Sequence, residues 1–203
     1  MSVRRLADPH LQPKEFSFTA ENRAWAEQQI KKYPEGRQAS AVIPLLWRAQ
    51  EQNGWLSQKA IEHVAEFLGM ARIRVLEVAT FYTMFLLQPA GKRAHVQVCG
   101  TTPCRLRGAD DLFKVCARRI HAEPFHVSAD GNFSWEEVEC LGACVNAPMV
   151  LIWSDTYEDL TAESFEKVLD GFASGKPVKP GPQIDRQFSA PIGGATTLKS
   201  EKV

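Results

Sequence analysis

Four of the five cysteines in this 203-residue chain stand in two close pairs. Cys99 and Cys104 lie in V-C-G-T-T-P-C, and Cys140 and Cys144 lie in E-C-L-G-A-C. A metal centre built on such pairs takes deprotonated thiolates from two loops, so the fold must bring the two loops together. This requirement constrains the fold more than any other feature of the sequence.

The spacing within the pairs favours an iron–sulfur cluster. Four residues separate the first two cysteines and three separate the second two, whereas structural zinc sites commonly use a C-x2-C spacing. Thiol–disulfide exchange is also typical of C-x-x-C, which counts against that chemistry. Structural zinc remains the main alternative on spacing alone. The fifth cysteine, Cys116, is expected to be a buried core thiol. It falls on the apolar face predicted for its helix, which also carries Leu106, Ala109, Phe113, Ala117 and Ile120.

The residues beside the cysteines also suit a cluster. Gly100 and Gly142 let the backbone approach closely, because they carry no Cβ. Backbone N–H groups in G-T-T and L-G-A are placed to donate to sulfur and tune its potential. A helix starting near Cys104 directs its positive end toward an anionic centre, and Arg105 and Arg107 are expected to raise the potential further.

Composition excludes several classes of partner. Positive and negative side chains balance at 24 each, so neither nucleic acid nor an anionic membrane surface is expected to bind. No apolar run reaches about 18 residues, and we expect no direct membrane insertion. The N-terminus lacks the apolar segment of a secretory signal, which predicts a cytoplasmic protein. Neither G-x-G-x-x-G nor a Walker pattern occurs, so no nucleotide site is expected on this chain.

The sequence pattern predicts four parts: an N-terminal extension at 1–18, a helical bundle at 19–90, a second domain at 91–175 and a Pro/Gly-rich extended tail at 176–203. Apolar stripes at helical spacing define the bundle, with Ser57 as one N-cap and Gly69 as one helix end. The helices predicted for the bundle cover 19–32, 37–52, 57–69 and 72–85.

The second domain alternates strands and helices. Thr161 is a predicted N-cap, and both cysteine loops follow strands, which places them at one edge of a sheet. The β-α-β-β-β-α order suggests a thioredoxin-like layer sandwich, so the whole chain is expected to be α/β (α+β), a helical bundle followed by that domain. The predicted strands cover 94–99, 125–128, 133–140 and 149–154, and the predicted helices cover 104–120 and 161–172.

Several segments carry a resemblance to a known family. Through them the chain closely resembles the E subunits of bacterial NADH:quinone oxidoreductases, the peripheral [2Fe–2S] subunits of respiratory complex I. The segments are Q-N-G-W-L at 52–56, E-V-A-T-F-Y-T-M-F at 77–85, V-Q-V-C-G-T-T-P-C at 96–104, V-E-C-L-G-A-C-V-N-A-P-M at 138–149, Y-E-D-L-T at 157–161 and G-K-P-V-K-P-G-P at 175–182.

The resemblance implies that Cys99, Cys104, Cys140 and Cys144 ligate one [2Fe–2S] cluster in a thioredoxin-like domain. It also implies a partner subunit that binds NADH and FMN, with which the cluster exchanges single electrons, and a neighbouring iron–sulfur subunit. The chain would be an oxidoreductase subunit without catalytic residues of its own and would not oxidise NADH alone. Its place would be the cytoplasmic side of the bacterial inner membrane, held there through the complex.

Two alternatives stay open. The same architecture serves as the diaphorase subunit of NAD-linked hydrogenases and formate dehydrogenases, and a structural zinc-binding interaction module would belong to a different class. The bundle and the tail are candidates for the partner surface. Thioredoxin-like folds often carry a cis-proline before the strand that follows 148, which makes Ala147–Pro148 a candidate cis bond.

Overall fold

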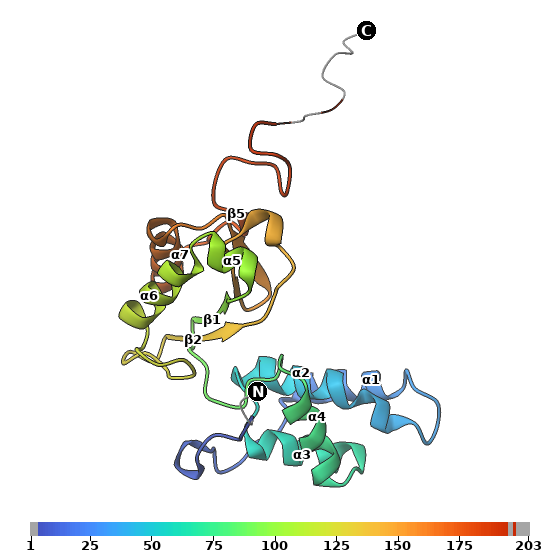
Figure 1. Ribbon diagram of the computed structural model, residues 1–203. Helices are drawn as coiled ribbons and strands as arrows, with labels where there is room; N and C mark the ends of the chain where they lie inside the picture. Colours follow the sequence, from blue (N-terminus) through green and yellow to red (C-terminus); the bar gives the residue numbers. More distant parts are fainter. Residues whose placement is uncertain (1–3, 195–196, 198–203) are drawn as a thin grey trace. The chain divides into compact units, whose positions relative to one another are not determined.

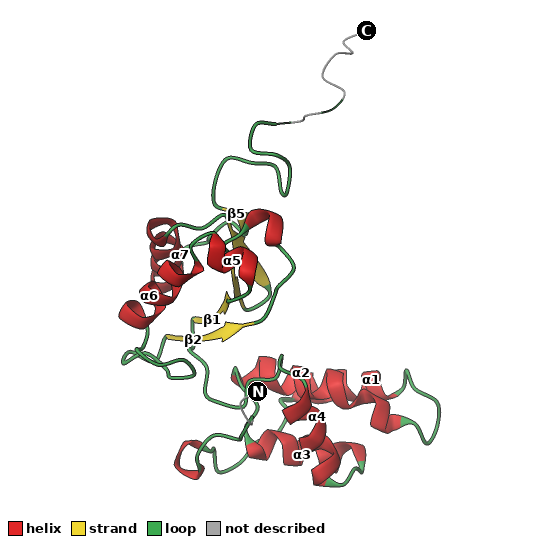
Figure 2. Cartoon of the chain, viewed as in Figure 1, coloured by secondary structure: helices red, strands yellow, loops and turns green. Residues whose placement is uncertain are grey.

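The computed structural model describes residues 4–194 and 197, and the chain divides into two compact units, Met1–Ala90 and Gly91–Val203. The first unit is helical, whereas the second combines helices with a five-stranded sheet (Figure 2). This mixture confirms the expected α/β class. Within the described residues, no helix is both long and apolar enough to cross a membrane.

The helices of the first unit begin and end at residues with the expected capping chemistry. Thr19 accepts a hydrogen bond from the N–H of Asn22, and Ser57 accepts one from Ala60. Gly69 ends a helix with φ of 61°, in the left-handed region that favours glycine. The elements are η1 (Pro9–Leu11), α1 (Ala20–Ile30), η2 (Gln38–Ala41), α2 (Val42–Asn53), α3 (Gln58–Leu68) and α4 (Arg72–Phe81).

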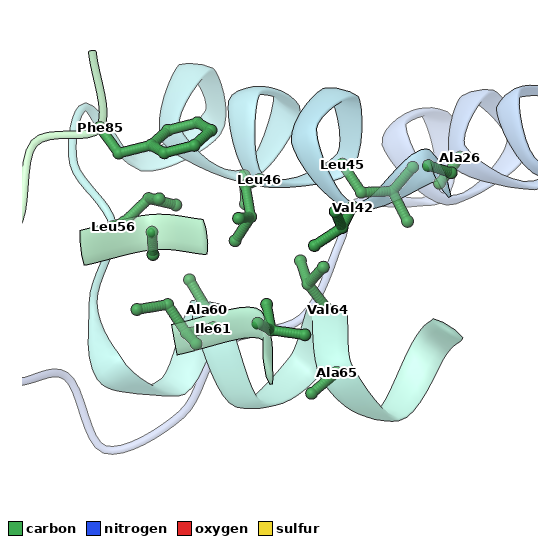
Figure 3. Packing of buried hydrophobic residues seen from close by; sticks show 14 of the residues in the cluster. Ala26, Val42, Leu45, Leu46, Leu56, Ala60, Ile61, Val64, Ala65 and Phe85 are labelled. Carbon is green, nitrogen blue, oxygen red and sulfur yellow. The ribbon is translucent and has the colours of Figure 1, made fainter. Parts of the chain in front are cut away.

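One apolar core holds the first unit together. Leu46 and Val42 of α2 point toward Val64 of α3, and Phe85 closes one end of the cluster (Figure 3). Each fully buried side chain of this size contributes about 1.5–3 kcal/mol through removal of apolar surface from water. The packing of α2 on α3 is therefore a main source of stability for this unit.

The predicted helix over 72–85 is too long, because α4 ends at Phe81 and Tyr82 is extended. The guanidinium of Arg4 donates hydrogen bonds to the backbone carbonyl oxygens at this end. Those oxygens would otherwise accept the N–H groups of a further helical turn. The chain from Tyr82 onward is thus held in a turn. Arg4 donates to the carbonyl oxygens of Ala79 (3.3 Å), Thr80 (3.3 Å), Tyr82 (2.6 Å) and Phe85.

The second unit is built on one mixed sheet with the strand order β2-β1-β3-β4-β5. β2 runs parallel to β1 and β5 runs parallel to β4, whereas β3 is antiparallel to β1 and β4. The elements are β1 (Ala94–Cys99), α5 (Thr102–Leu106), α6 (Ala109–Arg119), β2 (Phe133–Val138), η3 (Cys144–Asn146), β3 (Val150–Ile152), β4 (Asp155–Glu158), α7 (Ala162–Ser174) and β5 (Gly181–Pro182).

Helices α6 and α7 lie side by side in the second unit (Figure 1). Leu112 of α6 and Phe165 of α7 pack with Val96 and Val98 of β1 in one buried cluster. Ion pairs from Arg118 and Arg119 of α6 reach Glu166 and Asp170 of α7. The cap that begins α7 is Thr161, as predicted.

Local backbone geometry corrects three predictions. The single helix predicted over 104–120 is two helices, because Gly108 has a φ of 105° and breaks the chain direction. Leu106 is 81% exposed and does not belong to the buried face. The strand predicted over 125–128 is only an isolated bridge, and Phe125 has a φ of 65°.

The sheet also differs at its edges from the prediction. β2 ends at Val138 rather than at residue 140, and β3 is confined to Val150–Ile152. β4 was not predicted, because D-T-Y-E is too polar to read as a strand. Part of the expected tail, β5, pairs with β4. The Ala147–Pro148 peptide bond is cis, as predicted.

Candidate metal centre

The sheet register brings the two cysteine loops to one edge. Cys99 is the last residue of β1 and stands opposite Val138, the last residue of the parallel strand β2. Cys140 follows two positions after that strand, and the N–H of Gly100 donates to the carbonyl oxygen of Val138 over 2.9 Å. Since parallel strands that end together start their loops together, both cysteine loops lie at the carboxyl edge of β1 and β2. Cys104 lies within α5, and Cys144 begins η3.

The thiol of Cys99 is buried and prepared for ionisation. Burial alone would raise its pKa, but hydrogen bonds from the hydroxyl and N–H of Thr101 and from the N–H of Leu141 outweigh it, and the pKa lies below the usual value. The Thr101 hydroxyl is 3.3 Å from the Cys99 sulfur. Leu141 belongs to the second cysteine loop, so a group of that loop favours the ionised form of Cys99 in the first.

The thiol of Cys104 keeps its proton more strongly. Burial raises the pKa of Cys104 to about 12, and its hydrogen bond to Cys99 acts in the same direction. The N–H of Met149 donates to the Cys104 sulfur and partly opposes this effect. Cys99 and Cys104 are each 1% exposed, so this half of the site is closed to water.

Cys140 and Cys144 form the exposed half of the site, with their sulfur atoms 3.4 Å apart. The N–H of Gly142 donates to the Cys140 sulfur at 3.4 Å and, with the Cys144 thiol, lowers the pKa of Cys140. The pKa of Cys144 is raised because its thiol donates to Cys140. In both pairs, therefore, one sulfur accepts a hydrogen bond from the other.

The donor set fits a [2Fe–2S] cluster. Such a cluster takes two thiolates on each of two irons, and the structure supplies two pairs of thiols. Thr101 lowers the pKa of both Cys99 and Cys140, one cysteine of each pair. N–H groups that donate to sulfur are the contacts that tune a cluster of this kind. In residues 4–194 and 197, no three His, Cys, Asp or Glu side chains surround one point in a way that could hold a single metal ion.

Arg105 joins the same edge of the sheet. Its Nε donates to the carbonyl oxygen of Gly100 over 3.2 Å, and its guanidinium pairs with Asp110 and with Glu137. The guanidinium also lies over the ring of Phe113, 4.6 Å from the ring centre. Two carboxylates therefore share the charge of Arg105. The expected increase of the cluster's reduction potential by Arg105 stays a prediction. Arg107 is exposed.

Sequence reasoning identified the four cysteines but missed the side chains that connect them. The N–H groups of Thr101 and Leu141 lie in the segments predicted to donate to sulfur, whereas the hydroxyl contacts of Thr101 were not predicted. Asn146, two residues after Cys144, is buried and was also missed, because nothing in its local sequence marks it. Cys116 is buried as expected, and burial raises the pKa of its thiol.

Comparison with known proteins decides the family. The model of the thioredoxin-like [2Fe–2S] ferredoxin family matches residues 26–173. This chain belongs to that family. The match covers both the bundle helices from α2 onward and the whole cysteine site, which confirms the resemblance found in the sequence.

Relatives of known name agree with this assignment. The chain is 67% identical to the E 1 subunit of the NADH-quinone oxidoreductase of Rhizobium meliloti (strain 1021) over 202 residues, which cover 98% of this chain and 74% of the relative. It is 54% identical to the E subunit of the NADH-quinone oxidoreductase of Rickettsia bellii (strain RML369-C) over 156 residues, which cover 76% of this chain and 93% of the relative.

A solved structure shares the fold. An NAD+-reducing [NiFe]-hydrogenase in the H2-reduced state aligns with a TM-score of 0.56 and 17% identity. The alignment covers 66% of this chain and 22% of the hydrogenase chain. At this identity the likeness concerns the fold alone.

Proposed function

We propose that this chain is the [2Fe–2S] electron-transfer subunit of an NADH:quinone oxidoreductase and that Cys99, Cys104, Cys140 and Cys144 hold its single cluster. One observation carries the proposal: the parallel strands β1 and β2 end together at Cys99 and Val138, where the N–H of Gly100 donates to the carbonyl oxygen of Val138 over 2.9 Å. This contact supports a single site for the two pairs of cysteines, because both cysteine loops start from it. Relatives at 67% and 54% identity that are named as E subunits of NADH-quinone oxidoreductase support the choice of complex.

The residues of the site divide the work between them. When bound, the cluster supplies a carrier that takes up one electron at a time. Cys99 and Cys104 close one side to water, and the exposed pair Cys140 and Cys144 faces solvent on the other. The N–H groups of Thr101, Leu141 and Gly142 stabilise negative charge on the thiolates. Electrons therefore enter and leave most directly on the Cys140–Cys144 side.

In this proposal, the groups that exchange electrons with the cluster lie on other subunits. A neighbouring subunit binds NADH and FMN and exchanges single electrons with the cluster, and a further iron–sulfur subunit lies beside it. The complex holds this chain at the cytoplasmic side of the bacterial inner membrane. The absence of a nucleotide-binding pattern in the sequence supports the assignment of NADH oxidation to the partner.

The test is anaerobic purification of the full chain, with iron and acid-labile sulfide measured together with EPR spectra of the reduced protein. We expect about two irons and about two sulfides per chain, as a [2Fe–2S] centre requires. Cys99→Ser and Cys140→Ser should lose iron, whereas Cys116→Ala should keep it, because Cys116 is a core thiol. Colourless protein that contains one zinc and no sulfide would contradict the proposal and favour the structural module.

A second candidate is the equivalent subunit of an NAD-linked hydrogenase or formate dehydrogenase. The fold shared with the NAD+-reducing [NiFe]-hydrogenase favours it, but at 17% identity. Purification of the native complex, followed by identification of its subunits, distinguishes the two hosts. A hydrogenase or formate dehydrogenase catalytic subunit in the complex would replace the leading proposal.

A further inference from the structure

The segment after β5 is anchored by a buried ion pair. Nη1 of Arg186 donates to both carboxylate oxygens of Asp159, at 2.9 and 3.1 Å. The two side chains are only 5% and 7% exposed. Arg186 also donates from Nε to the carbonyl oxygen of Ala190 over 2.9 Å, so the guanidinium organises the segment that carries it. Buried charges of this kind persist only when their partners stay in place.

The same segment reaches the turn that carries Cys144. Asn146, at the end of η3, is 3% exposed, and its Nδ2 donates to the carbonyl oxygen of Phe188 over 3.1 Å. The same amide group donates to the carboxylate of Glu158. Two bonds from one buried amide thus hold the Cys144 turn to β4 and to the C-terminal segment.

Asp159 connects the two anchors. Its N–H donates to the carbonyl oxygen of Asn146 over 2.7 Å, while its carboxylate holds Arg186. Asp159 has a φ of 52°, a left-handed conformation that costs energy in a residue other than glycine. The two sets of contacts hold Asp159 in this conformation, because its backbone N–H must point toward Asn146 while its carboxylate must point toward Arg186.

We propose that residues 184–190 form a strap that fixes the Cys144 turn, with the Asp159–Arg186 ion pair as its anchor. The inference rests on the proposed function, because it concerns a cluster held by Cys144. Arg186 and Asp159 are positioning residues that act through Asn146 and touch no ligand themselves. A turn without the strap moves more easily, so its thiolate leaves the metal more often and the surroundings of the cluster change.

The experiment compares the full-length wild type with Arg186→Gln, both purified anaerobically with the cluster bound. The rate of iron release to an excess of chelator and the visible circular dichroism of the cluster are measured. We expect Arg186→Gln to release iron at least fivefold faster and to change the dichroism spectrum. Arg186→Lys, which keeps the charge but has no second nitrogen for the carbonyl oxygen of Ala190, should lie between the two. Arg118→Gln, which removes the same charge from the exposed pair with Glu166, is the matched control.

A second variant, shortened after Gln183, removes the strap while leaving β5 in place, and it decides the question if Arg186→Gln does not fold. Iron release as slow as in the wild type, with an unchanged dichroism spectrum, in either folded variant would overturn the strap. Wild-type protein without acid-labile sulfide would instead refute the proposed function. The two failures are therefore distinguishable.

Discussion

Arg105 and Glu137 connect the two halves of the cysteine site: Nη2 of Arg105 donates to Oε1 of Glu137 over 2.6 Å. Arg105 directly follows Cys104, and Glu137 lies near the end of β2, the strand that leads to Cys140. The Nε of the same guanidinium holds the carbonyl oxygen of Gly100. One side chain therefore fixes the start of both ligand loops while its charge is shared with carboxylates.

Replacement of this side chain tests its electrostatic role. Arg105→Gln leaves the carboxylates of Asp110 and Glu137 without their cation, so reduction of an anionic centre nearby becomes harder. A unit charge about 10 Å away changes the free energy by about 0.4–1.7 kcal/mol, which corresponds to roughly 20–70 mV for one electron. We expect the midpoint potential in a redox titration to fall by this amount. An unchanged potential, or an equal fall in Arg118→Gln, would show that Arg105 has no specific influence.

Two leucines, one buried and one exposed, test how much burial contributes to the stability of the second unit. Leu112 of α6 is fully buried, whereas Leu106 of α5 is 81% exposed. Leu112→Ala leaves a cavity in the core of the second unit and should lower the free energy of unfolding by about 2–5 kcal/mol. Leu106→Ala should change it by less than about 0.5 kcal/mol. Chemical denaturation of both variants measures the difference, and equal losses would contradict the two-helix arrangement of α5 and α6.

Gly91 lies against the backbone of β2. A Cβ at this position would stand 2.4 Å from the Cα and the carbonyl carbon of Phe133, neither of which can move without the strand. We expect Gly91→Ala to destabilise the second unit by about 1–3 kcal/mol, as overpacking does. Gly193→Ala, where a Cβ meets nothing within 4 Å, is the control. Thermal unfolding of both variants tests this, and an unchanged midpoint for Gly91→Ala would contradict it.

His63 makes the stability of the first unit depend on pH. Its Nε2 accepts a hydrogen bond from the N–H of Phe18, and its ring contacts the rings of Phe16 and Phe67. Burial lowers the pKa of His63 below the ordinary value of 6.5. The unfolded chain therefore binds the proton first, and stability falls as the pH drops from about 6.5 through the lower folded-state pKa.

The matched variant for this prediction is His63→Gln, which keeps an acceptor for the Phe18 N–H but does not titrate. We expect the difference in unfolding free energy between wild type and His63→Gln to change over this pH range and to be constant above it. Urea denaturation at a series of pH values measures the difference. A difference that is the same at all pH values would show that His63 has the same pKa in the folded and in the unfolded chain.

Local sequence signals predicted the elements that depend on local chemistry. The caps at Ser57 and Thr161 and the glycine end at Gly69 are confirmed, because each uses hydrogen bonds within a few residues. The end of α4 was predicted wrongly, since the contacts that stop it come from Arg4, far away in the sequence.

The same distinction applies to the candidate site. The spacing of the cysteines and the order of the strands were enough to predict that both cysteine loops lie at one edge of the sheet. The contacts of Arg105 with Glu137 and of Asn146 with Phe188 were not predictable, because they join segments more than 30 residues apart through polar side chains that carry no periodic pattern. Such contacts depend on the finished fold.

Because Cys116 is buried, the alkylation of its thiol reports when the second unit unfolds. The Cys116 thiol, enclosed between α6 and the sheet, reacts with an alkylating reagent only when that packing opens, whereas Cys140 and Cys144 are exposed and become free to react once metal is lost. Mass spectrometry of samples quenched over time would therefore record early additions at Cys140 and Cys144 and a later addition at Cys116, and so separate demetallation from unfolding within one sample.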